Sequence, residues 1–154
     1  MLIYKSENIS VIIPQKCLKV LFELCEKANN LETGGIIYGN YSENLEDAIV
    51  YEFDKPPKDS KRGKTYFERG TFKVKEKIKK LWDKNIYYLG EWHYHPFSSP
   101  IPSYQDIIQM KKISKNKNFN CPEPILIIVG KVKEKFILSV HLFIENKKIE
   151  LILE

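Results

Sequence analysis

Apolar segments of two different periods alternate along the chain, and this alternation restricts the possible folds more than any other feature of the sequence. Three segments repeat apolar side chains at helical spacing: Pro14 to Ala28, Thr71 to Asn85, and Ser103 to about Asn116. Thr71 and Ser103 can cap the second and third helices. Before, between and after the three predicted helices, short runs rich in β-branched and aromatic residues predict strands over residues 10–13, 35–41, 48–53, 86–95, 125–129, 136–143 and 149–153.

The resulting order of elements, β-α-β-β-α-β-α-β-β-β, predicts one domain over residues 1–154 of the α+β or α/β type. A chain of 154 residues buries one substantial core but is short for two independent domains. A mixed or antiparallel sheet flanked by helices buries all of the predicted apolar faces. Residues 55–70 interrupt the pattern with prolines, glycines and lysines and few apolar side chains, so we expect an exposed, mobile loop there.

The charge of the chain argues against a nucleic-acid-binding protein. The formal net charge is +5, but the basic surplus is lysine, and Arg62 and Arg69 are the only arginines. Arginine is the side chain that most often reads base edges, whereas lysines along helices usually form a solvated face. We therefore do not expect a nucleic-acid partner, and an acidic protein partner fits the charge as well.

No segment of the sequence predicts membrane association or secretion. No apolar run approaches the roughly 20 residues that cross a bilayer, and the first residues lack the order of a signal peptide. We therefore expect a cytoplasmic protein. Three cysteines, Cys17, Cys25 and Cys121, without a C-x-x-C pair, argue against a disulfide framework and a cysteine zinc site. We expect Cys17 and Cys25 to line the core in a reducing compartment.

Two histidines at positions i and i+2 of a predicted strand are the strongest indication of chemistry. Side chains two residues apart in a strand point to the same face, so His93 and His95 can converge on one metal ion. Asp106 follows after a proline-stiffened loop and can add a carboxylate oxygen. Two imidazoles and one carboxylate leave a fourth position open, which is typical of a catalytic zinc ion.

Each part of this pattern also has a plainer interpretation. Ser103 and Asp106 have the spacing of a helix capping pair, with the acidic side chain in the favourable first turn. A His-x-His pair in a strand is often a hydrogen-bonded pair on a wet face. The complete pattern, H-x-H-x7-S-x2-D, arises rarely by chance in a chain with 3 histidines, and a metal site explains all of it.

The segment His93-Tyr94-His95-Pro96, followed at these spacings by Ser103 and Asp106, resembles the signature of the JAMM/MPN (JAB-type) zinc metalloproteases. The segment Leu31-Glu32-Thr33-Gly34-Gly35-Ile36-Ile37-Tyr38-Gly39 is similar to the one that carries the upstream glutamate of that family. The resemblance extends from about Val11 to Phe143. It implies a curved mixed β-sheet flanked by helices, the cytidine deaminase-like fold of the family, which agrees with the predicted order of elements.

The resemblance also implies a role for each residue of the signature. His93, His95 and Asp106 would hold one zinc ion per chain. Glu32 would deprotonate the attacking water and later return the proton to the leaving amine. Ser103 would steady the oxyanion with its hydroxyl group.

Four further residues near the pattern or on a late strand require an interpretation. Glu91 shares the strand parity of the two histidines, but the family signature places the glutamate upstream, so we interpret Glu91 as a supporting or salt-bridged residue. Trp92 and Tyr94 point to the opposite face, and we expect them to pack in the core. His141 stands alone on a late strand, and we expect no functional role for it.

The segment from Gly90 to Pro96 and the length of the chain are more similar to bacterial members of the family than to eukaryotic proteasome or signalosome subunits. Such bacterial proteins often accompany activating-like and conjugating-like enzymes, and some belong to antiphage systems, including CBASS, in which they resemble deconjugases that remove a target from the C-terminus of a nucleotidyltransferase. The resemblance implies an isopeptidase or peptidase that cuts after the C-terminus of a ubiquitin-like or conjugated protein. Two alternatives stay open: a catalytically silent scaffold and a RadC-like DNA-associated protein.

We expect two regions to set the specificity of such an enzyme. A sheet edge near Gly34 and Gly35 would hold an extended substrate tail by main-chain hydrogen bonds, and the missing side chains would let the tail approach closely. Residues 55–70 carry six basic side chains against two acidic ones, so this loop would attract an acidic surface on the folded body of the partner.

Overall fold

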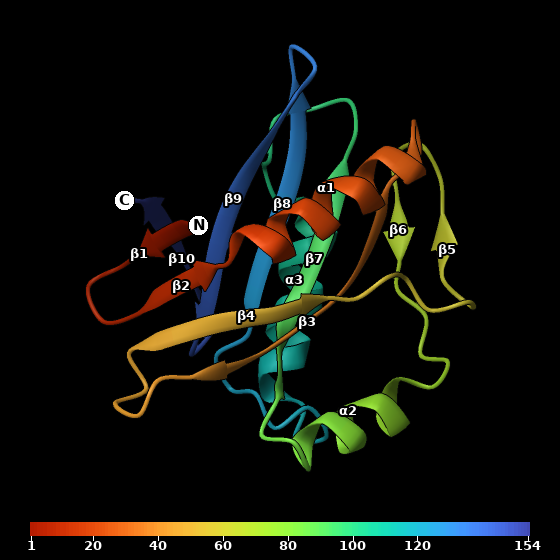
Figure 1. Cartoon of the computed structure of the whole chain (residues 1–154). Helices are drawn as coiled ribbons and strands as arrows, with labels where there is room; N and C mark the ends of the chain where they lie inside the picture. Colours follow the sequence, from red (N-terminus) through yellow and green to blue (C-terminus); the bar gives the residue numbers. More distant parts are fainter.

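The computed structural model describes residues 1–154 and contains one closed, barrel-like sheet with helices on both of its faces (Figure 1). Eight strands form the sheet in the order β1-β10-β9-β8-β7-β3-β4-β2, and β5 and β6 form a separate hairpin. The helices are α1 (Gln15–Ala28), α2 (Val74–Trp82) and α3 (Tyr104–Lys115). The strands are β1 (Leu2–Lys5), β2 (Ser10–Ile13), β3 (Thr33–Tyr41), β4 (Asp47–Phe53), β5 (Lys61–Arg62), β6 (Phe67–Glu68), β7 (Tyr87–His95), β8 (Ile125–Val132), β9 (Lys135–Ile144) and β10 (Lys147–Leu153).

The sheet is mixed, as the order of elements predicted. β2 pairs with β4, and β7 pairs with β8, in parallel, and every other pair of neighbours is antiparallel. Parallel neighbours cannot be joined by a tight turn, so the chain must cross over between β7 and β8. α3 lies in this crossover, and its first turn therefore follows closely after the end of β7 that carries the two histidines.

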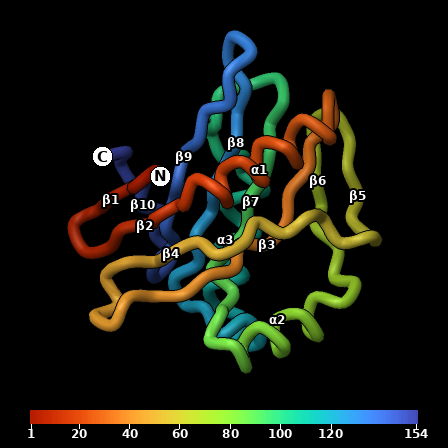
Figure 2. The backbone as a smooth tube through the Cα atoms, viewed as in Figure 1, coloured from red at the N-terminus to blue at the C-terminus, as the bar shows by residue number.

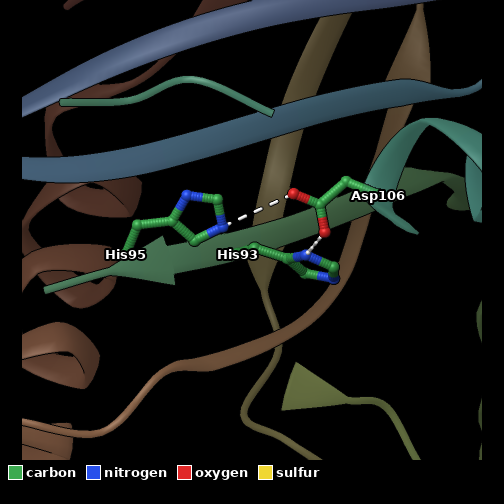
Figure 3. Close-up of side chains that lie close together, drawn as sticks. All are labelled: His93, His95 and Asp106. Carbon is green, nitrogen blue, oxygen red and sulfur yellow. Dashed lines mark hydrogen bonds and ion pairs between the residues drawn. The ribbon is translucent and has the colours of Figure 1, made fainter. Parts of the chain in front are cut away.

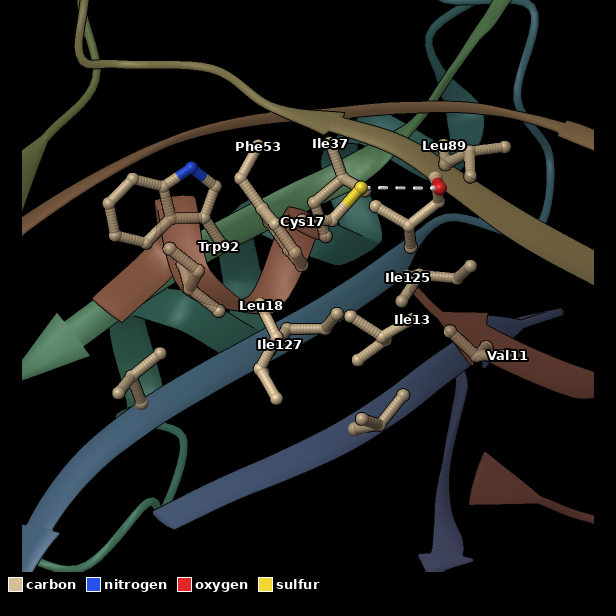
Figure 4. Close-up of a cluster of buried hydrophobic side chains, with 14 of the residues drawn as sticks. Val11, Ile13, Cys17, Leu18, Ile37, Phe53, Leu89, Trp92, Ile125 and Ile127 are labelled. Carbon is tan, nitrogen blue, oxygen red and sulfur yellow. Dashed lines mark hydrogen bonds between the residues drawn. The ribbon is translucent and has the colours of Figure 1, made fainter. Parts of the chain in front are cut away.

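The two faces of the sheet have separate cores. On one face, strand side chains such as Trp92 pack with α1, and Cys17 and Cys25 lie in this core as predicted (Figure 4). On the other face, side chains such as Ile36 pack with α2 and α3. α1 accordingly crosses in front of β7 and β8 in Figure 1, and α3 lies behind them.

Both ends of the chain help to close the barrel. β1 lies between β2 and β10, so the first and last strands are neighbours and the two termini lie close together (Figure 2). The sequence did not predict β1, because only Tyr4 of its four residues is buried and so short a segment shows no clear period. None of the three helices has the length and apolar character needed to cross a membrane.

The predicted start of the second helix is wrong. α2 begins at Val74 after Lys73, and Thr71 contributes only a backbone carbonyl that accepts the N–H of Val74. The carboxylate of Asp59 accepts the N–H groups of Thr71 and Phe72 instead and holds both residues in a turn. The bounds of α1 and α3 agree with the prediction to within a residue at each end.

Residues 55–70, for which the sequence predicted an exposed, mobile loop, contain a short hairpin of β5 and β6 that is attached to the body of the protein. Glu32 donates its backbone N–H to the carbonyl of Gly63 over 2.8 Å. Arg69, which the sequence suggested as an exposed basic side chain, forms a buried ion pair with Glu91. The small number of apolar residues in the segment did not reveal these two attachments, because a backbone hydrogen bond and an ion pair make them.

Candidate metal centre

His93 and His95 lie at the end of β7, on the face that α2 and α3 cover. Trp92 and Tyr94 pack in the opposite core with α1, as predicted, and alternation along the strand therefore places both histidines on the other face. Both histidines are buried, with exposed fractions of 3% and 8%. β7 lies between β3 and β8 and is paired on both sides, so the two side chains stand on a rigid support.

The first turn of α3 brings Asp106 against these histidines. Ser103 caps the helix: its hydroxyl oxygen accepts the N–H of Asp106 over 3.1 Å, and the Asp106 carboxylate accepts the N–H of Ser103 over 2.8 Å. The capping interpretation of this pair is thus confirmed. It is compatible with a metal site, because the same carboxylate also contacts both histidines.

The three side chains converge on one point (Figure 3). Nδ1 of His93 lies 2.7 Å from Oδ1 of Asp106, and Nε2 of His95 lies 3.4 Å from Oδ2. One donor atom from each residue lies within 4.8 Å of the other two. Three donors this close together can share a single metal ion.

The electrostatics of the cluster favour a positive charge at its centre. Burial raises the pKa of Asp106, but hydrogen bonds from His93 and His95 outweigh burial and hold this pKa well below its ordinary value. The carboxyl group is therefore ionised at neutral pH, which is the form that binds a metal. Burial lowers the pKa of His95, but Asp106 and Glu32 raise it by more, so this pKa lies above its ordinary value.

The residues present fit a metal ion. Nδ1 of His93, Nε2 of His95 and the carboxylate of Asp106 face one another in a buried cluster. Two imidazoles and an ionised carboxylate are donors that zinc prefers, and three protein donors leave a position open for water or substrate.

Glu32 immediately precedes β3 and lies beside the cluster. The register of β3 and β7 pairs Thr33 with Tyr94, so the residue before Thr33 comes opposite His95. Oε1 of Glu32 lies 4.0 Å from Nε2 of His95. Burial raises the pKa of Glu32, and the two histidines offset only part of this rise.

A cleft of about 790 Å³ opens beside these residues. One wall consists of Thr65 to Arg69, which includes β6, and the other includes Gln105, Ile108 and Gln109 of α3. Glu32 and the metal-binding candidates His95 and Asp106 also line it. The cleft has the size of a ligand pocket and offers the hairpin and the helix as two opposing surfaces.

The structure changes the expectation that the missing side chains of Gly34 and Gly35 leave space for a substrate tail. Both glycines pair with β7 on one side, and the pairing of β3 with β4 runs only from Ile37 to Tyr41. A Cβ atom on Gly34 would lie 2.4 Å from the carbonyl oxygen of Trp92 and 2.7 Å from the ring of Phe67. The absent side chain of Gly34 thus makes room for β7 and the hairpin, whereas we had expected it to admit a substrate.

Phe67 is a residue near the site that no sequence pattern indicated. Its ring lies edge-on to the ring of His93, with 5.4 Å between the centroids. Because Phe67 belongs to β6, this contact joins the hairpin directly to a metal-binding candidate. Only the tertiary packing of two separate segments reveals it, since position 67 lies in a stretch without a clear period.

The interpretation of Glu91 as a salt-bridged residue is confirmed. Glu91 is fully buried, Oε1 lies 2.5 Å from Nε of Arg69, and Oε2 accepts a hydrogen bond from the hydroxyl of Tyr88. Both carboxylate oxygens therefore have protein partners. The ion pair connects the end of the hairpin to the strand that carries the histidines.

His141 lies outside the cleft and is held as a neutral imidazole. Ser139 donates its hydroxyl hydrogen to the carbonyl of Pro100 over 2.6 Å, so its oxygen can accept Nε2–H of His141 over 2.8 Å. Nδ1 is buried without a partner, and a proton there would have no acceptor. Burial, followed by the charge of Lys148, lowers the pKa of His141 from 6.5 to about 4.

We expect this histidine to make the stability of the fold depend on pH. Between pH 6.5 and about 4 the unfolded chain binds a proton at His141 that the folded chain does not bind, so the free energy of unfolding falls as the pH falls. Urea unfolding of wild type and His141→Gln measures this. Between neutral pH and about pH 4.5, wild type should lose about 1–3 kcal/mol more than the variant. Equal losses in the two proteins would contradict the assignment.

The sequence matches a known protein family. A family model described as prokaryotic homologs of the JAB domain matches residues 14–141, which include Glu32 and the three metal-binding candidates. The solution structure of protein DSY2949 from Desulfitobacterium hafniense superimposes with a TM-score of 0.68 and covers 91% of this chain and 88% of that chain. The two sequences are 16% identical, so this likeness concerns the fold alone.

Two curated relatives are each named CD-NTase/cGAS isopeptidase. The relative from Enterobacter hormaechei subsp. hoffmannii (strain UCI 50) is 38% identical over 121 residues, which cover 79% of this chain and 67% of the relative. The relative from Escherichia coli (strain TW11681) is 33% identical over 79 residues, which cover 49% of each chain. The matches thus span about two thirds of the first relative and half of the second.

Proposed function

The chain belongs to the family of prokaryotic homologs of the JAB domain, and we propose that it is a zinc-dependent isopeptidase that acts on a protein conjugate. The observation that carries this proposal is the convergence of His93, His95 and Asp106 at a cleft that His95, Asp106 and Glu32 line. The relatives named CD-NTase/cGAS isopeptidase support the same class of reaction.

The proposed roles follow from the position of each side chain. His93, His95 and Asp106 hold the zinc ion, which supplies a Lewis acid for hydrolysis of an amide bond. Glu32 takes a proton from the attacking water and gives it to the leaving amine. Ser103 accepts the N–H of Asp106 with its hydroxyl oxygen, and its own hydroxyl hydrogen is free to donate to the oxyanion.

The outer edge of β6 is the proposed binding surface for the tail of the substrate. β6 pairs only with β5, and Phe67 and Glu68 of this strand line the cleft. An extended tail can add to this edge as a further strand, held by main-chain hydrogen bonds and facing α3. Such binding places few demands on side chains and suits a tail that is threaded past the metal centre.

For the substrate, we propose a conjugate in which a CD-NTase is linked through an isopeptide or C-terminal amide bond to another protein. This proposal combines the names of the two relatives with the presence of all residues of the JAMM signature. The corresponding partners are ubiquitin-like or conjugated proteins and the activating-like and conjugating-like enzymes that form the bond.

Cleavage of a purified conjugate tests the function. Zinc-loaded wild type should release the intact CD-NTase, with a free carboxylate at the cleaved position by mass spectrometry. A chelator should stop the release, and added zinc should restore it, because the three protein donors bind the metal reversibly. No release by zinc-loaded protein would contradict this substrate. No hydrolysis of any conjugate or tail peptide would indicate a silent scaffold.

Metal content tests the ligand set separately from activity. We expect close to one zinc ion per wild-type chain and much less in Asp106→Ala, because the variant lacks the only carboxylate among the three donors. Ser103→Ala is the matched control, since it also breaks the helix cap but keeps every donor atom. Equal zinc in wild type and Asp106→Ala would remove Asp106 from the ligand set.

A further inference from the structure

A second groove lies between α2 and the segment that follows β4. It has a volume of about 640 Å³ and shares no lining residue with the catalytic cleft. Six lysines line it, and we call it the lysine groove: Lys55 and Lys58 after β4, and Lys73, Lys77, Lys80 and Lys84 in and beside α2.

The groove follows α2 from one end to the other. Lys77 and Lys80 lie three residues apart on one face of the helix, Lys73 directly precedes α2, and Lys84 lies two residues after its end. At a rise of 1.5 Å per residue, the nine residues of α2 span about 14 Å, which is the length of about four residues of extended chain. Lys75 and Lys79 of the same helix are exposed but do not line the groove.

The groove has an excess of positive charge that the protein itself does not neutralise. Lys77 forms ion pairs of 3.0 Å with Glu52 and with Asp54. None of the other five lysines has an ion-pair partner, and Glu76 is the one further carboxylate in the lining. Like charges along one groove raise the local potential, so the groove attracts an anionic ligand.

Apolar surface lies among these charges. Pro56 and Pro57 line the groove together with Phe72, a residue that is 48% exposed. The ammonium groups of Lys58 and Lys73 lie 5.8 Å and 5.4 Å from the centroid of the Phe72 ring. This mixture suits a peptide segment in which acidic and apolar residues alternate. A continuous phosphate backbone fits less well, because it would meet the three carboxylates, and the groove has no arginine to read bases.

The groove is linked to the hairpin that forms one wall of the catalytic cleft. Asp59 directly follows Lys58, and its carboxylate accepts the N–H groups of Thr71 and Phe72 just before α2. This contact joins the two walls of the groove at the base of the β5–β6 hairpin. A protein bound in the groove therefore lies at the base of the hairpin whose outer strand lines the cleft.

We propose that the lysine groove docks an acidic segment, with apolar residues interspersed, on the protein conjugate that the catalytic cleft hydrolyses. The identity of this partner rests on the proposed function, whereas the chemistry of the docked segment rests on the groove itself. This interaction raises the affinity of the enzyme for the conjugate and speeds their association, in addition to the binding of the tail in the cleft.

A fluorescein-labelled peptide of alternating glutamate and leucine is the probe for the groove. Lys80→Glu/Lys84→Glu should weaken its binding about fivefold or more at about 50 mM salt, and the difference should shrink at about 300 mM salt. Lys75→Glu/Lys79→Glu is the matched control, because it makes the same change of charge outside the groove. Equal losses in both variants, or no loss in the groove variant, would overturn the proposal.

Two further measurements identify the class of ligand that binds in the groove and test this proposal independently of the proposed function. Single-stranded RNA of similar length should bind more weakly than the peptide. RNA binding that is tighter than peptide binding and is lost in the groove variant would overturn the proposal and show that the groove binds a nucleic acid. On the conjugate, the groove variant should raise KM and leave kcat unchanged, and on a short tail peptide both should stay at wild-type values. Failure of wild type to cleave would refute the function and leave the peptide-binding result valid.

Discussion

Glu32→Gln should cleave the conjugate about 10²–10⁴ times more slowly than wild type while keeping its fold and its zinc. Oε1 of Glu32 lies 4.0 Å from Nε2 of His95 in the cleft, where it can meet a water molecule beside the metal-binding candidates. Glutamine has the same shape as glutamate but cannot accept the proton. The values of kcat and KM on the conjugate, together with zinc content and circular dichroism, measure the effect.

Ser103→Ala serves as the comparison, and we expect a smaller loss of rate, because it removes a hydrogen-bond donor and leaves the proton acceptor in place. Undiminished cleavage by zinc-loaded Glu32→Gln would place the general base elsewhere. Glu91 would not then be the obvious substitute, since Arg69 and Tyr88 occupy both of its carboxylate oxygens.

Arg69→Met should lower the free energy of unfolding by about 3–5 kcal/mol. The side chains of Arg69 and Glu91 are 5% and 0% exposed, so the loss of the arginine leaves the carboxylate buried without its counter-charge. Urea unfolding followed by fluorescence and by circular dichroism measures the change. Because Arg69 ends the hairpin, the variant should also bind substrate more weakly where it remains folded.

A double variant separates the charge from the packing at this position. Arg69→Met/Glu91→Leu removes both charges, and it should be more stable than Arg69→Met alone, because an apolar pair carries no desolvation penalty. The exposed pair Lys5 and Glu154, with side chains 50% and 51% exposed, is the control. Lys5→Ala should change stability by no more than about 1 kcal/mol. A similarly small effect of Arg69→Met would contradict the assigned role of the ion pair.

The sequence alone was sufficient for features that depend on neighbouring residues. The first residues of α1 and α3 followed from Pro14 and from the cap at Ser103, since the start of a helix depends on a few adjacent side chains. The shared face of His93 and His95 followed from the period of two in any strand, whatever its partners. The spacing to Asp106 suggested convergence, and the helix cap that delivers Asp106 was itself readable from the sequence.

Only the tertiary structure decided how distant segments meet. The register of β3 and β7 places Glu32 opposite His95, and Gly34 packs against the carbonyl of Trp92 and the ring of Phe67, where we expected space for a substrate. The ion pair of Arg69 and Glu91 attaches a hairpin that the sequence suggested was mobile. The strength of these pairings depends on the burial of apolar surface and on the low dielectric around buried charges, which exist only once the chain has folded, so no local period records them. For the same reason, the lysines of α2 resembled a solvated helix face until the segment after β4 was seen opposite them.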